Sequence, residues 1–341
     1  MGRVRKATLS DVAEKAGVSR TTVSYILGKT RGGFAKETVE RVQQAAKELG
    51  FKPSPIARSL RTGRSGLIGL VVESDGLSSR CYNRCQIEAG IAAEAIKHQQ
   101  DVLQVIVSSD RGAEIRRVGD LLRSGLVEGL ILTAHSHRPV IDWLVDYGAK
   151  FVVIGNADGP GVATVDVDNV GLGAAMAQHL IDLGHTNLMY IAPPDNVAHG
   201  NDRAEGFLLA CAEAGIPPER SNIVRAEHSR AGGYVAMKSA IAGGLRATGV
   251  CATDDAMAYG AIAAIREAGL MVPKDISVVG CNNDRSVGID RHFLTTFELD
   301  FVRLGAIAAA KLIALIEERP MGSRRELVGF RFIQGKSSGP A

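Results

Sequence analysis

Hydroxyl, guanidinium and phenol groups crowd a short stretch near the start of the chain, at Ser19, Arg20, Thr21, Thr22, Ser24 and Tyr25. Hydroxyl groups donate hydrogen bonds to phosphate oxygens, and an arginine can pair with O6 and N7 of guanine. Such residue types on one small surface are suited to binding double-stranded DNA. The surrounding sequence must then supply a helix that carries them.

The flanking residues predict two short helices joined by a tight turn. Thr8 can cap the first helix, and Asp11, three residues later, completes a capping box. Gly17 supplies the left-handed conformation that ends a helix, and Ser19 can cap the second. Each helix has an apolar stripe, formed by Val12, Ala13 and Ala16 and then by Val23, Ile26 and Leu27. This pattern predicts a helix-turn-helix, whose second helix enters the major groove of DNA.

The distribution of charge agrees with this prediction. Residues 1–65 contain 14 Lys and Arg against five Asp and Glu, a net charge of +9, whereas residues 66–341 carry a net charge of −6. A solvated, lysine-rich tail would also be basic, but here the basic residues alternate with periodic apolar positions. A basic N-terminal segment of this kind is typical of phosphate binding, because each neutralised phosphate releases counterions.

Length and composition predict a cytoplasmic α/β protein. The 341 residues suit two or three domains, and 45% hydrophobic with 5% aromatic residues is typical of an Ala/Val/Ile/Leu-rich fold. We expect no secretory signal and no membrane span, since no apolar run is long enough. Five scattered cysteines favour reduced thiols. Cys81 and Cys85 could share a helix face and bind metal or sense oxidants, although packed or half-exposed free thiols are the simpler interpretation.

Two further helices complete the N-terminal part. Residues 35–49 predict a third helix that ends at Gly50, with Phe34 or Phe51 closing its small core. Pro53 and Pro55 interrupt the chain, because a proline lacks an N–H and restrains its neighbour. Residues 56–61 then predict a short hinge helix that needs a partner to be stable. We therefore divide the chain into a head (1–53), a hinge helix with its linker (54–65) and a core (66–341).

Apolar runs alternate with amphipathic segments throughout the core. Buried parallel strands are expected at residues 67–72, 102–107, 127–132, 151–154, 188–191, 249–253 and 276–280. Helices are expected between them, at residues 85–99, 114–124, 140–147, 171–183, 203–214, 231–241 and 256–268. The pattern restarts after residues 162–167, which predicts two doubly wound sheets. Ligands of such sheets bind beyond the carboxyl ends of the strands, so two facing lobes could close on a small molecule.

Several short motifs, in this order and spacing, resemble the lactose-repressor (LacI/GalR) family of bacterial regulators. They are the helix-turn-helix, residues 55–60, 179–185, 203–207, 253–260, 275–280 and 294–296. The resemblance implies a three-helix head, a hinge helix and a two-lobed core like a periplasmic binding protein. It places the first lobe at about 66–163 and 299–328 and the second at about 164–298 and 329–341. It also implies dimers, with tetramers as an alternative, on near-palindromic operators.

The same resemblance assigns roles in the head and hinge. Arg20 and Thr21 match positions that contact base edges, whereas Ser19, Thr22 and Ser24, with Thr8, fit capping and phosphate binding. Tyr25 stands where many members have an arginine, and it either contacts a base or packs on the DNA backbone. Ala57 and Leu60 match the hinge residues that enter the minor groove, where Leu60 would wedge into a base step or contact the second hinge helix. Ala35 replaces the family's usual Ser or Thr cap.

The resemblance also implies an effector site. Arg203 matches an arginine that holds ligand hydroxyls or carboxylates, with a surface salt bridge as the alternative. Of the pair Asp254 and Asp255, we expect Asp255 to cap a helix and Asp254 to contact the ligand. Asn282 replaces a ligand-binding aspartate. Further candidates, for which solvated loops are the alternative, are Asp75, Arg80, Arg84, His135 and His228. The arginines favour an anionic effector such as a sugar acid or sugar phosphate. His179 and His185 are expected to be structural.

Together these features predict a cytoplasmic, nucleoid-associated repressor of carbohydrate-utilisation genes whose operator affinity depends on a sugar-like effector. An enzyme fused to a DNA-binding head is one alternative, but the sequence has no phosphate-binding glycine loop, Gly-x-Ser-x-Gly elbow or histidine-rich metal motif. We therefore expect no cofactor, no metal and no catalytic residue. A sugar-binding transport protein is the other alternative, which the basic head disfavours.

Overall fold

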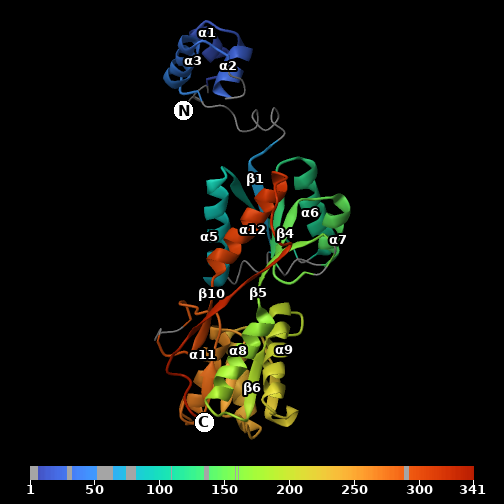
Figure 1. Ribbon diagram of the computed structural model, residues 1–341, viewed down its shortest axis with the longest axis vertical. Helices are drawn as coiled ribbons and strands as arrows, with labels where there is room; N and C mark the ends of the chain where they lie inside the picture. The colour runs from blue at the N-terminus through green and yellow to red at the C-terminus, as the bar shows by residue number, and fades with distance from the viewer. Residues whose placement is uncertain are drawn as a thin grey trace, which may run out of the picture. The chain divides into compact units, whose positions relative to one another are not determined.

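The computed structural model describes residues 7–28, 33–51, 64–73, 82–108, 110–133, 138–157, 159, 161–287 and 292–341. These residues belong to two compact units, one spanning Met1–Leu67 with Leu121–Glu128 and the other Ile68–Asp120 with Gly129–Ala341. Figure 1 shows the course of the chain. The predicted hinge helix, with Ala57 and Leu60, lies outside the described residues. The three segment boundaries therefore stay predictions.

The head folds as its capping residues predict. Its helices are α1 (Leu9–Ala16), α2 (Arg20–Leu27) and α3 (Lys36–Glu48). Thr8 and Asp11 form the reciprocal capping box, and Gly17 ends α1 with φ 65° in the left-handed region. Ala35 precedes α3 without a side-chain cap, as its type implies. The three helices bury one small core, on which Phe34 and Phe51 both pack.

The first lobe is built on a parallel sheet with six strands among the described residues, in the order β11-β5-β4-β3-β1-β2. The strands are β1 (Leu67–Glu73), β2 (Asp101–Val107), β3 (Leu130–Thr133), β4 (Phe151–Ile154), β5 (Ala163–Val167) and β11 (Arg325–Val328). Its helices are α5 (Tyr82–Lys97), α6 (Arg111–Arg123), α7 (Arg138–Tyr147) and α12 (Phe301–Ile316). Helices α5 and α12 lie side by side, with α6 and α7 across the sheet (Figure 1). Because β5 belongs to this sheet, the sheet continues to Val167, past the lobe boundary expected near residue 163.

The second lobe has a four-stranded parallel sheet among the described residues, in the order β7-β6-β8-β9. Its strands are β6 (Leu188–Ala192), β7 (Ser221–Arg225), β8 (Gly249–Ala252) and β9 (Ser277–Val279). Its helices are α8 (Asn169–Asp182), α9 (Ala198–Glu213), α10 (Arg230–Ala242) and α11 (Asp255–Glu267), with the short 3-10 helix η2 (Pro218–Arg220) before β7. An antiparallel pair, β10 (Thr296–Leu299) and β12 (Phe330–Ile333), lies at the lobe boundaries expected near residues 298 and 329.

Three pairs of helices cross closely. At each crossing, a glycine on each helix packs directly against the backbone of the other helix. At the α8–α9 crossing, a Cβ on Gly173 would lie 2.6 Å from the carbonyl carbon of Arg203, and one on Gly206 2.8 Å from that of Val170. Real Cβ contacts are longer than 3.0 Å. The same reciprocal arrangement joins α5 to α12 and α10 to α11, through the pairs Gly90 and Gly305 and Gly233 and Gly260. The α8–α9 crossing holds the backbone of α9 at Arg203, the candidate effector residue.

The last residues of the chain lie against β9, the edge strand of the second sheet. Val278 N donates to the carbonyl of Ser337 at 2.7 Å, which satisfies the strand edge. His179 Nε2 and the hydroxyl of Ser338 lie 2.9 Å apart, and His185 Nε2 lies 3.1 Å from the carbonyl of Gly339. Burial lowers the pKa of both imidazoles. These contacts confirm that His179 and His185 are structural.

In the described part of the chain, no helix is both long and apolar enough to cross a membrane. Cys85, Cys211, Cys251 and Cys281 are free thiols, and all except the exposed Cys85 are buried. Cys81 lies outside the described residues, so its predicted proximity to Cys85 stays untested. No group of three or more metal-binding side chains gathers within the described ranges.

Candidate functional site: an exposed helix and a buried arginine

Helix α2 presents the predicted base-reading residues to solvent. Ser19 caps the helix, and its Oγ accepts a hydrogen bond from Thr22 N at 3.0 Å. Arg20 and Thr21, in the first turn, are exposed, whereas Val23 and Ile26 are buried in the head. The helix therefore holds Arg20 and Thr21 on an open surface, as base contacts require.

Among the other residues predicted to contact DNA, some have hydrogen-bonded side chains and others are partly buried. The hydroxyls of Ser19 and Thr22 lie 2.8 Å apart, and that of Thr8 donates to Asp11 Oδ2 at 2.9 Å. Ser24 and Tyr25 are partly buried on α2. Thr8 and Ser19 thus cap helices in the free head, and their proposed phosphate contacts would come in addition to capping.

Arg203 is the centre of a polar cluster at the carboxyl ends of the strands in the second lobe. Its side chain extends from α9 and is 5% exposed. Nε donates to Asn169 Oδ1 at 2.9 Å, and Nη1 donates to the carbonyl of Thr253 at 2.6 Å. Thr253 Oγ1 in turn lies 2.6 Å from the hydroxyl of the buried Tyr190. The two bonds hold the guanidinium plane in a fixed orientation.

Asp254 and His228 form a pair beside this cluster. His228 Nε2 donates to Asp254 Oδ2 at 2.7 Å, and Asp254 Oδ1 accepts from Met257 N at 2.8 Å. Burial would raise the pKa of Asp254, but the hydrogen bond and charge of His228 hold it below its usual value. The rings of His228 and His199 lie 5.7 Å apart, so two imidazoles stand at this site.

The roles expected of the two neighbouring aspartates were wrong in one respect. Asp254, and not Asp255, is the N-cap of α11. Asp255 points inward, where Oδ1 accepts from Thr296 Oγ1 and Oδ2 from Asp284 N, both at 2.6 Å. Burial raises the pKa of Asp255 to about 8. Asp255 therefore joins α11 to β10 and the loop after β9, which is a structural role.

Of the remaining effector candidates, the structure describes Asn282 and Arg84. Asn282 follows β9, is 9% exposed and accepts from Cys281 Sγ at 3.3 Å through Oδ1. Arg84 lies on α5 in the first lobe, where Nε donates to Glu88 Oε1 at 2.8 Å. Three further candidates lie outside the described residues, namely Asp75, Arg80 and His135. Of the second-lobe candidates, Asp254 is close enough to Arg203 for their charges to interact, and His228 is bonded to Asp254.

Four residues of the cluster were not predicted from sequence, namely Asp166, Asn169, Tyr190 and Thr253. Asp166 is the last residue but one of β5, and burial raises the pKa of its carboxyl to about 6, although the nearby charge of Arg203 lowers it. Asn169 follows three residues later at the start of α8. The sequence feature that could have identified such residues is a run of polar residues directly after a buried strand.

Comparisons with known proteins agree with this architecture. Residues 8–54 match the pattern of bacterial regulatory proteins of the lacI family, and residues 177–338 match a periplasmic binding protein-like domain. An HTH-type transcriptional repressor PurR of Erwinia tasmaniensis is 34% identical, over 92% of this chain and 91% of that protein. The chain belongs to the LacI family.

Solved structures extend the likeness to nearly the whole chain. A Lac repressor dimer bound to operator and the anti-inducer ONPF has a TM-score of 0.87 at 26% identity, covering 98% of this chain and all of that one. A complex of the transcriptional regulator CelR with cellobiose has a TM-score of 0.72 at 25% identity, covering 97% and 99%. The protein is a DNA-binding transcriptional repressor of the LacI type, with a helix-turn-helix head and a periplasmic-binding-protein-like core. Its relatives are repressors and not enzymes, which confirms the non-enzymatic prediction.

Proposed function

We propose that this repressor controls carbohydrate-utilisation genes and that a sugar-like effector, bound at Arg203, switches its affinity for a palindromic operator. The observation that carries the proposal is the incomplete hydrogen bonding of the Arg203 guanidinium to the described protein groups. The guanidinium is buried, yet only Nε and Nη1 donate to described protein groups, whereas an arginine has five N–H donors. Nη2 is thus available to a ligand oxygen.

The chemistry around Arg203 suits a ligand with hydroxyl groups and one negative charge. A carboxylate or phosphate can accept two parallel hydrogen bonds from an arginine. Asn282 both donates and accepts, and it adds no negative charge that would repel an anion. The Asp254–His228 pair offers an acceptor and an imidazole to ring hydroxyls. A sugar acid or sugar phosphate fits this set, and the similar regulator CelR is a precedent for a sugar ligand in this fold.

The switch would act through the two lobes of the core. An effector that binds the closed arrangement of the lobes more tightly than the open one shifts the population toward closure. In a dimer this shift would move the paired hinge segments and so alter operator affinity. The same mechanism serves induction or co-repression, depending on which arrangement binds DNA.

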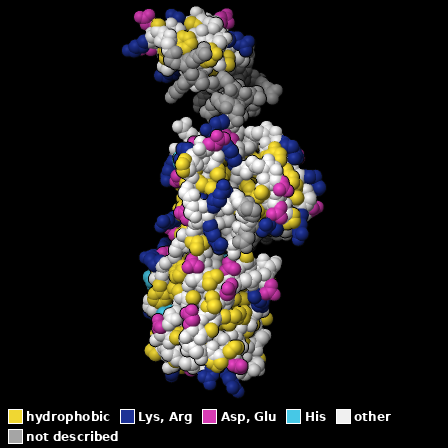
Figure 2. Space-filling model, turned by 45° about the vertical axis from the view of Figure 1, so that its right-hand side comes forward, with side chains coloured by type: hydrophobic (Ala, Val, Ile, Leu, Met, Phe, Trp, Pro, Cys, Tyr) yellow, Lys and Arg dark blue, Asp and Glu magenta, His cyan; other side chains and the backbone are white. Residues whose placement is uncertain are grey.

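Dimerisation through the first lobe is supported by its exposed apolar side chains. Ile96 on α5 is 72% exposed and Ile106 on the edge strand β2 is 49% exposed. An unpaired strand edge with apolar side chains favours association. Apolar side chains are also visible over the face of the second lobe (Figure 2). We expect Ile106→Glu to shift the full chain from dimer to monomer in sedimentation equilibrium.

A thermal-shift screen of the full chain tests the effector assignment. The panel contains neutral sugars (ribose, cellobiose), a sugar acid (gluconate), a sugar phosphate (glucose 6-phosphate) and purine bases, since PurR proteins are among the relatives. A ligand at 100 times its dissociation constant adds about 2.7 kcal/mol of stability. We expect the largest shift from an anionic sugar.

Two variants locate the binding site of the compound that gives the largest shift. Arg203→Met should abolish the shift, and Arg266→Met should preserve it, because Arg266 lies on α11 with its guanidinium over Phe293. Stabilisation only by neutral sugars would contradict the anionic assignment, and stabilisation only by purines would contradict the sugar assignment. As a regulator of operators, the protein is proposed to act in the bacterial cytoplasm, at the nucleoid.

A further inference from the structure

Two hydrogen bonds connect Arg203 to the place where the polypeptide crosses from the first lobe to the second. Arg203 Nε donates to Asn169 Oδ1 at 2.9 Å, and Asn169 Nδ2 donates to Asp166 Oδ1 at 3.3 Å. Asp166 lies near the end of β5 in the first sheet, and Asn169 begins α8 of the second lobe. The half-buried carboxyl of Asp166 is thus joined to the candidate effector arginine through a single side chain.

The Asp166 carboxyl can take up a proton without losing either of its hydrogen bonds. The bond from Val167 N, at 2.7 Å, and the bond from Asn169 Nδ2 both end on Oδ1. Within the described part of the chain, Oδ2 accepts no hydrogen bond. A proton on Oδ2 therefore removes the negative charge and leaves the crossover segment in place.

Two opposite charges on α9 act on this carboxyl. Burial, the largest influence, raises the pKa of Asp166 to about 6, while the charge of Arg203 lowers it and that of Asp202 raises it. The adjoining strands place uncharged residues beside it, since its register partner on β11 is Leu327 and the residue after β4 is Gly155. The charge state of Asp166 therefore depends on the charge at Arg203.

We propose that Asp166 takes up a proton from solvent when an anion binds to Arg203, so that anionic effectors bind more tightly at lower pH. A bound anion offsets the guanidinium charge that favours the ionised carboxyl. An ionised Asp166 also repels the anion, whereas a protonated one does not. The proposal rests on the proposed effector site and adds a pH-dependent regulation to it.

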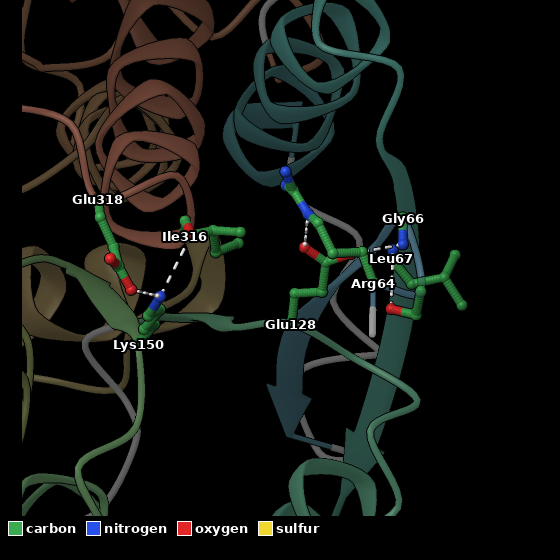
Figure 3. Close-up of polar contacts among 8 residues, drawn as sticks. Arg64, Gly66, Leu67, Glu128, Lys150, Ile316 and Glu318 are labelled. Atoms are coloured by element: carbon green, nitrogen blue, oxygen red, sulfur yellow. Dashed lines mark hydrogen bonds and ion pairs between the residues drawn. The ribbon is translucent and has the colours of Figure 1, made fainter. Parts of the chain in front are cut away.

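The first experiment measures the coupling between the two charges without any ligand. Urea unfolding is followed from pH 4 to 8 for the wild type, Asp166→Asn, Arg203→Gln and the double variant. Asparagine keeps the acceptor Oδ1, and glutamine keeps an N–H donor. The control cycle combines Glu318→Gln with Lys150→Met, because these side chains form a more exposed ion pair at 3.3 Å (Figure 3).

The folded state keeps the Asp166 proton up to about pH 6, whereas the unfolded state loses it near pH 4. The unfolding constant of the wild type relative to Asp166→Asn should therefore rise by about tenfold per unit from pH 4 to 6 and then level off. With Arg203→Gln in both proteins, the rise should continue for about one further unit, because the folded-state pKa is higher.

In the control cycle, removing Lys150 should change the contribution of Glu318 by less than about threefold at every pH. A rise that ends at the same pH with and without Arg203 would overturn the proposal. If Arg203→Gln does not fold, the binding experiment decides, since it needs only Asp166→Asn.

The second experiment measures gluconate binding by isothermal titration calorimetry from pH 5.5 to 8, where an ordinary carboxyl stays ionised. Wild-type affinity should fall relative to that of Asp166→Asn by about tenfold over this range, which corresponds to one pKa unit. Any pH dependence caused by the imidazoles of His199 and His228 stays in Asp166→Asn, so the ratio of the two affinities isolates Asp166. A constant ratio would overturn the proposal.

The buffer dependence of the binding heat counts the protons directly. In imidazole and in phosphate buffer, which differ in ionisation enthalpy, the heats should differ for the wild type and agree for Asp166→Asn at pH 7. Failure of the proposed function would be visible separately, as no gluconate binding by either protein. The ligand-free cycle would then still support or overturn the coupling by itself.

Discussion

Gly173→Ala should destabilise the second lobe, although alanine is the better helix former. Gly173 lies inside α8, where its Cα faces the backbone of Arg203 on α9. A Cβ at this position would be 2.6 Å from the carbonyl carbon and 2.8 Å from the Cα of Arg203, and closer still to the carbonyl oxygen. Ordinary contacts are 3.4–4 Å, so the helices must separate by roughly 1 Å.

The size of the effect follows from two opposing contributions. Replacing glycine by alanine in a helix interior stabilises by about 1 kcal/mol. Overpacking a close contact costs about 1–3 kcal/mol, and the upper end applies because a backbone carbonyl cannot rotate away as a side chain can. We therefore expect a net loss of about 2 kcal/mol in the free energy of unfolding.

Urea unfolding followed by far-UV circular dichroism measures this loss, with Gly243→Ala as the control in the same lobe. Gly243 follows α10 with φ −78°, and a Cβ there would meet its nearest neighbour at 3.3 Å. The control should stay within about 0.5 kcal/mol of the wild type. An unfolding midpoint for Gly173→Ala equal to or above that of the control would refute the close-crossing argument.

Three further changes test the head, the C-terminal strap (residues 337–339, which lie against β9) and a buried acid. Ser19→Ala removes the cap of α2 and should cost about 1 kcal/mol, seen as faster amide exchange in α2 with the core unaffected. Ser337→Ala should cost about 1–3 kcal/mol in urea unfolding, because the buried N–H of Thr295 loses its acceptor; an unchanged midpoint would show that the strap adds no stability. Burial raises the pKa of Asp255 to about 8, so the folded state keeps a proton that the unfolded state loses near pH 4. Stability from this group should therefore fall as the pH rises from about 4 to 8, by at most about 1.4 kcal/mol per unit. Asp255→Asn should remove that slope, and identical slopes for both proteins would contradict it.

The sequence predicted best those features that depend on near neighbours. The Thr8–Asp11 capping box, the left-handed Gly17 and the Ser19 cap each involve residues within three positions, so the local sequence suffices to specify them. Most strands and helices of the core were also predictable from alternation of apolar runs. Helix α12 and strands β7, β10, β11 and β12 were not predicted, and β7 and β12 are largely exposed or half-buried, which weakens the apolar signal.

The site was predicted less completely because its contacts join distant parts of the chain. Arg203 was expected from the resemblance to the family, but its partners Asn169 and Thr253 lie 34 and 50 residues away. Asp254 and Asp255 are chemically equivalent in sequence. Only the packing of β10 against α11, which places Thr296 beside Asp255, decides which of them is buried.

The most direct test of the account measures operator affinity with and without the compound that gives the largest thermal shift. A duplex that the wild-type chain selects from random-sequence DNA is titrated with the wild-type chain and with Arg203→Met at one salt concentration. We predict that the compound changes wild-type affinity by at least about fivefold, the low end of allosteric coupling, and leaves the affinity of the variant unchanged. Equal changes in both proteins, or none in either, would contradict a repressor switched by a ligand at Arg203.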